Sequence, residues 1–228
     1  MVTEKDTIRC EAIFNEEHTH RFLWKRIWNK DKPVAAIIML NPSQSDNIVT
    51  DTTTTLVVNN IARLERYGGV EILNLYSLLT NKLNFRWNSD EDLNDPENDD
   101  YIRKASEECS EVIVAWGKSA DTNKRLAERA KAVVELLRPQ KSKIFMISDG
   151  ERMGLHPLTP SLRNQWIITP FDWAGHDKAL AKATAEAEKQ ATETTKSAAK
   201  SVGRKKGNPA AKEAEKNENS GTKEDDAK

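Results

Sequence analysis

The sequence lacks the features that define secreted, membrane-spanning and metal-rich proteins. Its two cysteines, Cys10 and Cys109, have no metal-binding or redox spacing, which excludes an iron–sulfur cluster and favours free thiols. No apolar run approaches the roughly 20 residues of a membrane span, and the N-terminus has no apolar segment typical of a signal peptide. We therefore expect a cytoplasmic protein with no membrane partner.

Aromatic residues are absent from the C-terminal part of the chain. All Trp, Phe and Tyr residues lie at or before Trp173, whereas residues 174–228 consist mainly of Ala, Lys, Glu, Thr, Asn and Gly. Such a segment has too little apolar surface to bury a core. The sequence therefore predicts one globular domain over residues 1–173 and a largely disordered polar tail over residues 174–228, with some helical propensity in residues 177–201.

The formal net charge of −1 gives no sign of a strongly basic surface. It argues against a protein that coats nucleic acid without specificity, although a local basic patch is compatible with it.

What is present is a set of short apolar strands that run directly into polar, turn-rich loops. Near-continuous apolar runs suit strands of a parallel sheet that is buried on both faces. They occur at residues 34–40, 70–73, 112–115 and 144–147, with a last short run at 166–169. Helical patterns over residues 51–66, 95–109 and 121–137 separate them.

The alternating pattern of residues 7–28 is different and predicts an antiparallel hairpin before the first buried strand. The alternation of strands and helices that follows predicts a three-layer α/β/α fold. We expect a mostly parallel sheet of four or five strands, preceded by the N-terminal β-hairpin.

Polar residues follow the predicted strands at the edge where a ligand is expected. In open α/β sheets, ligands bind outside the carboxyl ends of the strands. The side chains that we expect to converge there are Asn41, Asp46, Asn74, Trp116, Lys118 and His156.

Each of these side chains also has a purely structural interpretation. Asn41 forms a turn with Pro42, or it orients a nucleophilic water, since an amide cannot act as a strong base. Asn74 ties two loops together, or it hydrogen-bonds the edge of a base. His156 is structural, or it stabilises negative charge on a leaving group.

The charged candidate residues also have a structural and a functional interpretation. Asp51 is best explained as a helix cap, whereas Asp46 has no capping role and is available to a water or a metal. Lys118 lies in Gly117-Lys118-Ser119, but Val112 stands where a phosphate-binding P-loop needs glycine. Lys118 still precedes a predicted helix N-terminus, where a phosphate is favoured.

Histidine gives no firm indication of a metal. His18 and His20 share one face of a predicted strand, but no third ligand is evident. We expect no metal site and no cofactor.

Four blocks taken together resemble a known family. The run Met39-Leu-Asn-Pro-Ser43 with Asp46, then Asn74-Leu75, then Ala115-Trp-Gly117 and finally His156-Pro-Leu158 resembles a bacterial and phage family of unknown function, domain of unknown function 1643. The resemblance covers roughly residues 8–173. It implies no established activity.

More distantly, the same blocks resemble the uracil-DNA glycosylase superfamily. Leu40-Asn41-Pro42 is similar to its water-positioning motif, and the strand ending at Asn74 to its base-reading strand. His156-Pro157-Leu158 is similar to the His-Pro-Ser motif that contacts the flipped base. The sequence departs from that pattern, because Met39 and Ser43 replace glycines and Leu158 replaces serine.

The distant resemblance implies recognition of a nucleobase or nucleotide, with DNA as one source, and hydrolysis of an N-glycosidic bond. Asn41, Asp46 and His156 would be catalytic. The substrate-binding residues would be Pro42, Ser43, Asn74, Trp116, Gly117, Lys118, Pro157 and Leu158. The alternative is a non-catalytic binding module that keeps the pocket for a small ligand or a partner protein.

Overall fold

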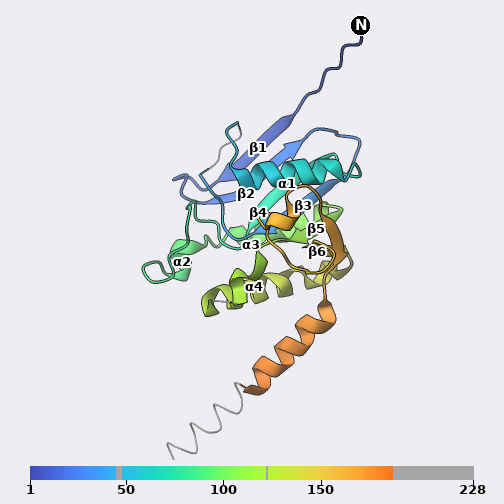
Figure 1. The fold of residues 1–228 in the computed structure, drawn as a ribbon. Helices are drawn as coiled ribbons and strands as arrows, with labels where there is room; N and C mark the ends of the chain where they lie inside the picture. The colour runs from blue at the N-terminus through green and yellow to red at the C-terminus, as the bar shows by residue number, and fades with distance from the viewer. Residues whose placement is uncertain (45–47, 122, 187–228) are drawn as a thin grey trace, which may run out of the picture. The chain divides into compact units, whose positions relative to one another are not determined.

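The computed structural model describes residues 1–44, 48–121 and 123–186, and it is built around one mixed β-sheet (Figure 1). The strands lie in the order β1-β2-β4-β3-β5-β6-β7. Their bounds are β1 Arg9–Phe14, β2 Arg21–Ile27, β3 Val34–Met39, β4 Gly69–Asn74, β5 Glu111–Val114, β6 Ile144–Ser148 and β7 Ile167–Pro170.

The centre of the sheet is parallel and its edges are antiparallel. β4, β3, β5 and β6 pair in parallel, which confirms the parallel core expected from the apolar runs. β1 and β2 form the predicted hairpin. The α-helices of this part of the chain are α1 Thr52–Arg63, α2 Asp90–Leu93, α3 Asn98–Glu108 and α4 Lys124–Leu137.

The expected number of strands was wrong, since the described residues form a sheet of seven strands rather than four or five. The hairpin is not a separate feature, because β2 pairs antiparallel with β4 and extends the same sheet. At the other edge β7 pairs antiparallel with β6. Both additions are long-range pairings, whose partners the local sequence pattern does not specify.

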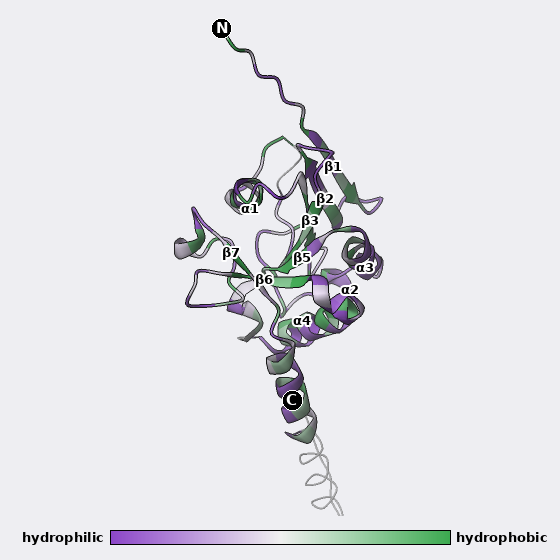
Figure 2. Cartoon of the chain, turned by 90° about the vertical axis from the view of Figure 1, so that its right-hand side faces the viewer, coloured by the Kyte–Doolittle hydropathy of each residue, from purple (hydrophilic) through white to green (hydrophobic). Residues whose placement is uncertain are grey.

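Alternate residues of the buried strands face two different layers. On one face, Ile37 and Ile72 pack in a cluster with Val57 and Ile61 of α1. On the other face, α3 contacts β2, β4 and β5. Figure 2 shows the central strands of this sheet largely in the colour of apolar residues, whereas the helices on either side mix apolar and polar colours.

The layer on the α1 side differs from the expected layer of helices. α1 covers part of this face, and the rest is covered by the irregular segment between β6 and β7. Leu155, Leu162 and Trp166 of that segment are buried in the same cluster as α1. This packing fixes a long loop against the sheet near the carboxyl end of β6.

The chain divides into two units, Met1–Phe171 and Asp172–Lys228. In the second unit, residues 173–186 are helical. The tail was expected to be largely disordered over residues 174–228, and residues 187–228 lie outside the described part of the chain. Within the described part, no helix is both long and apolar enough to cross a membrane.

We expect deletion of residues 174–228 to leave the melting temperature of the protein nearly unchanged. The buried hydrophobic residues all lie at or before Trp166 in the described part of the chain. Thermal melts of the full and truncated chains measure the difference. A fall of more than about 5 °C, roughly 1 kcal/mol or more for a domain of this size, would contradict the expectation.

Candidate functional site

A pocket of about 320 Å³ lies at the carboxyl end of β3, where a ligand site was expected. Its walls come from the start of β2, the loop after β3, the start of α1, the β4–α2 loop and the β6–β7 loop. The lining residues are Arg21, Met39, Leu40, Asn41, Ser43, Asp51, Thr52, Thr53, Thr54, Thr80, Asn81 and His156.

The loops after β3 and β4 run side by side because their pairing continues beyond the sheet. The Leu75 amide donates to the Met39 carbonyl at 2.9 Å, and the Tyr76 amide donates to the Leu40 carbonyl at 3.1 Å. Further on, the Thr80 amide donates to the Pro42 carbonyl at 3.2 Å. These bonds hold Asn41 and Thr80 on adjacent walls of the pocket.

The side chain of Asn41 has a fixed orientation. Its Nδ2 donates to the Thr80 carbonyl at 2.6 Å and to the Pro42 carbonyl at 3.2 Å. Because both partners are acceptors, the nitrogen and oxygen of the amide cannot be exchanged. No donor in the described part of the chain binds its Oδ1. Asn41 therefore offers the pocket a hydrogen-bond acceptor.

His156 has the opposite polarity. Its Nδ1 accepts the Leu158 amide at 3.1 Å, so in the neutral ring the proton lies on Nε2. Burial lowers the pKa of His156 and so favours this neutral form. The imidazole can therefore donate from Nε2 to a ligand.

Gly117 supports His156 from the end of β5. It has a φ of +71°, and a Cβ at this position would lie 2.8 Å from the Cβ of His156. Only glycine combines this backbone conformation with so close an approach. Gly117 is thus a packing partner of the histidine in this structure.

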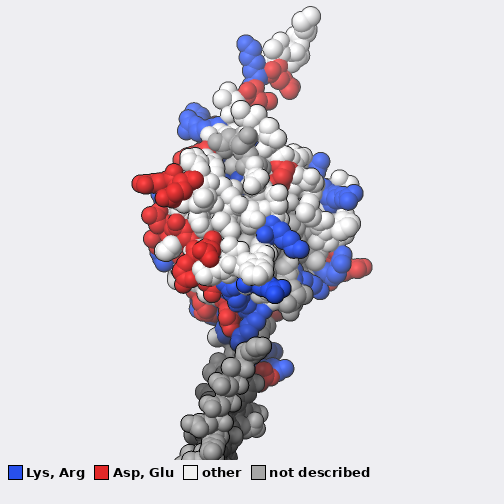
Figure 3. All heavy atoms as spheres, turned by 90° about the vertical axis from the view of Figure 1, so that its left-hand side faces the viewer, with Lys and Arg blue, Asp and Glu red and all other residues white. Residues whose placement is uncertain are grey.

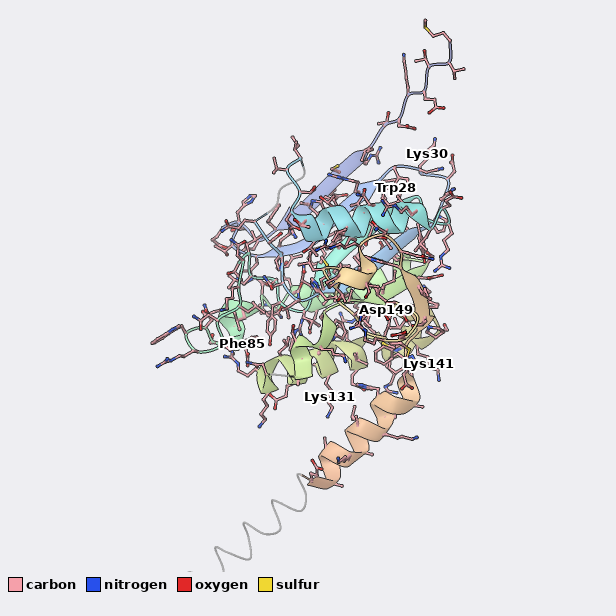
Figure 4. The ribbon with its side chains drawn as sticks, in the orientation of Figure 1. Trp28, Lys30, Phe85, Lys131, Lys141 and Asp149 are labelled. Carbon is pink, nitrogen blue, oxygen red and sulfur yellow. The ribbon has the colours of Figure 1, made fainter. Side chains whose placement is uncertain are left out.

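A polar network fixes the loop that carries His156. Asp149, labelled in Figure 4, directly follows β6. Its Oδ2 accepts the Ser161 hydroxyl at 2.7 Å and Arg152 Nη2 at 2.6 Å. The bonds from Ser161 and Arg152 hold the pKa of Asp149 well below its usual range. The two ends of the loop are thereby tied together around His156.

The start of α1 forms a charged wall. Asp51 caps the helix through the Thr54 amide at 2.7 Å, as the sequence favours, and it also accepts the Ser43 hydroxyl. Opposite charge is supplied by Arg21, of which only 2% is exposed. Burial lowers the pKa of Arg21 to about 10, and attraction to Asp51 opposes that effect.

Asn74 lies behind the pocket rather than in its lining. It is buried, and the orientation that satisfies its amide donates to the Asn41 carbonyl at 3.2 Å and to the Leu73 carbonyl at 3.3 Å. These are the contacts of a residue that ties the two loops together.

The other predicted residues are placed as follows. Pro42 and Pro157 are buried beside lining residues, Trp116 is partly exposed, and Lys118 and Leu158 are exposed. None of these five is among the lining residues of the described pocket. Asp46 lies outside the described residues.

Across residues 1–44, 48–121 and 123–186, no group of three or more His, Cys, Asp or Glu side chains is arranged to hold a metal ion.

A comparison with protein-family models shows to which family the chain belongs. It matches the family "Protein of unknown function (DUF1643)" over residues 21–158. The chain belongs to this family. Arg21 stands at the first matched position, and the match extends through His156 to Leu158, so it spans every lining residue of the pocket. Neither the curated proteins nor the solved structures gave a match.

Arg21 was not predicted as a site residue, although the sequence around it indicates that it is a candidate for burial. Arg21 directly precedes Phe22-Leu23-Trp24, and a charged residue at the start of a strand whose next residues are apolar is a candidate for burial. Thr80 was missed because it contributes its backbone carbonyl, which no residue pattern marks.

Replacing Gly117 with alanine should destabilise the protein more than the same change at Gly154. Both glycines have positive φ, of +71° and +68°, but a Cβ at Gly154 would meet its nearest atom at 3.8 Å. We expect Gly154→Ala to cost about 1–2 kcal/mol from the backbone alone. Gly117→Ala should cost about 1–3 kcal/mol more from the contact with His156. Urea denaturation measures both, and equal losses would contradict the packing role.

The lowered pKa of His156 predicts a stability contribution that depends on pH. The unfolded imidazole has a pKa of about 6.5. Below that pH the unfolded chain binds a proton more readily than the folded one, so the free energy of unfolding falls as the pH falls. The corresponding loss from Asp149, whose folded pKa is also lowered, begins only at or below about pH 4.

We therefore expect the stability advantage of the wild type over His156→Asn to shrink between about pH 8 and pH 5. Urea denaturation of both proteins over this range is the measurement. A difference that is constant, or that grows on acidification, would show that the imidazole is not held in its neutral form.

Proposed function

We propose that this chain recognises a nucleobase or nucleotide in the pocket at the end of β3. The observation that carries the proposal is the fixed and opposite polarity of two lining side chains. Asn41 offers an acceptor at Oδ1, and His156 offers a donor at Nε2. The edge of a nucleobase presents neighbouring N–H and carbonyl groups, which need such a pair.

The size and position of the pocket support a small ligand. Its volume of about 320 Å³ is near the lower end of the range for small-molecule sites, roughly 300–1,000 Å³. Its position outside the carboxyl end of a parallel strand is the usual place for a ligand in open α/β sheets. The resemblance of the loop motifs to uracil-DNA glycosylases points to the same class of ligand.

A second candidate function is hydrolysis of the N-glycosidic bond of that ligand. The specific observation in its favour is the acceptor atom of Asn41, which is held by two carbonyls and can orient a water. A donor at His156 Nε2 would stabilise charge on the departing base. If the chain does not catalyse this reaction, it is a non-catalytic binding module that binds its ligand in the same pocket.

Binding is tested by calorimetric titration of the full chain with a panel of nucleosides. Asn41→Ala should weaken the affinity by about tenfold, the value of one hydrogen bond at the upper end of its usual range. Asn59→Ala, on the exposed side of α1, is the matched control and should leave affinity unchanged. Equal affinity of wild type and Asn41→Ala would contradict the proposed role of Asn41.

Catalysis is tested by release of free base from nucleosides and from DNA that carries uracil, mismatched or modified bases. His156→Ala should raise the barrier by about 2–4 kcal/mol, as loss of one donor to a developing anion does. His176→Ala is the control outside the pocket. Binding of a nucleoside without any release by the wild type would assign the chain to the non-catalytic class.

A further inference from the structure

The wall of the pocket contains a buried arginine. Arg21 is only 2% exposed, yet it is one of the lining residues. Burying a charged guanidinium costs several kcal/mol unless hydrogen bonds and opposite charge compensate it. Arg21 therefore places a positive charge in the lining of an open cavity, where a ligand that enters the cavity can contact it.

Asp51 attracts Arg21 within the pocket wall, and its carboxylate also accepts hydrogen bonds from other donors. Oδ1 accepts the Thr54 amide at 2.7 Å, and Oδ2 accepts the hydroxyls of Ser43 and Thr54. Burial lowers the pKa of Arg21 to about 10, so the guanidinium is still charged near neutral pH, and the attraction of Asp51 favours that charged form. A guanidinium has five N–H donors in a planar fork, so it can serve Asp51 and a ligand together.

The remaining lining residues add hydrogen-bond donors to the pocket and contribute no further carboxylate. Thr52 and Thr53, in the first turn of α1, contribute hydroxyl groups, and Asn81 contributes an amide. Arginine with neighbouring hydroxyl donors is the combination that binds phosphate oxygens.

We propose that Arg21 binds the phosphate of a single nucleotide whose base lies at Asn41 and His156. The inference rests on the proposed function, and it narrows the ligand from a nucleobase in general to a nucleoside monophosphate. It also assigns a specificity-determining role to a residue outside the loop motifs.

The charge distribution favours a single nucleotide over a nucleic-acid strand. Residues 90–100, which include α2 and the start of α3, are rich in Asp and Glu. Figure 3 shows acidic side chains gathered along one side of the face that it draws. A strand would need a continuous row of Lys and Arg contacts to its phosphates, and an acidic surface does not supply such a row.

The experiment compares nucleosides with their 5′-monophosphates by calorimetric titration of the full chain. We expect each monophosphate that binds to do so at least about tenfold more tightly than its nucleoside, the effect of charge-assisted hydrogen bonds. Arg21→Gln should bring this ratio close to one, and Arg21→Lys should restore part of it. Equal affinities for nucleoside and monophosphate in the wild type overturn the inference.

The matched control is Arg26→Gln on the same strand. Arg26 stacks over the Trp24 ring at 4.8 Å from its centroid and is not a lining residue of the pocket. Its replacement should leave the ratio unchanged. If Arg21→Gln does not fold, the wild-type ratio and the Arg21→Lys variant still decide the question.

Inorganic phosphate separates failure of this inference from failure of the proposed function. If nucleosides bind and their 5′-monophosphates bind no more tightly, base recognition is supported and the proposed role of Arg21 is wrong. If inorganic phosphate raises the melting temperature of the wild type but not that of Arg21→Gln, and nucleotides raise it no further, phosphate binding at Arg21 is supported and base recognition is not. If a single-stranded oligonucleotide binds more tightly than any monophosphate, the assignment to a single nucleotide is overturned.

Discussion

The candidate site depends on the hydrogen bonds that join the loops after two buried parallel strands, β3 and β4. β3 and β4 stop at Met39 and Asn74, but their loops stay paired through backbone hydrogen bonds. The Asn98 side chain donates to the Asn74 carbonyl at 3.1 Å, and Asn41 Nδ2 donates to the Thr80 carbonyl at 2.6 Å. Because an unpaired buried amide is costly, this chain of bonds leaves each group little freedom.

One consequence is that residues with the same sequence pattern have different structural roles. Asn41 and Asn74 both end apolar strands, yet only Asn41 lines the pocket, while Asn74 holds the Asn41 carbonyl from behind. In the same way, His156 reaches the pocket and Gly117 supports it through close packing. The supporting residues set the orientation of the polar groups that a ligand would meet.

The sequence predicts the parts of this arrangement that are local. Apolar runs predicted the parallel core, and the residues that follow them predicted that Asn41 and His156 lie at one edge of it. Non-local pairing was not predictable in the same way, because nothing in residues 21–27 marks β4 as the partner of β2. The place of Arg21 is also non-local, because its amide donates to the Ser77 carbonyl of the loop after β4 at 2.9 Å. The role of Asn74 was left open, because a strand-terminal amide has the same pattern whether it binds a ligand or another loop.

The account requires His156 to be a neutral imidazole with its proton on Nε2, presented to a ligand. Long-range ¹H–¹⁵N spectra of the full chain near pH 7 report the state of each ring nitrogen. We expect a protonated Nε2 and an unprotonated Nδ1 for His156, and a nucleoside monophosphate that shifts the Nε2 resonance more than the Nδ1 resonance. A proton on Nδ1, or a His156 ring that no base, nucleoside or nucleotide perturbs, would contradict the account.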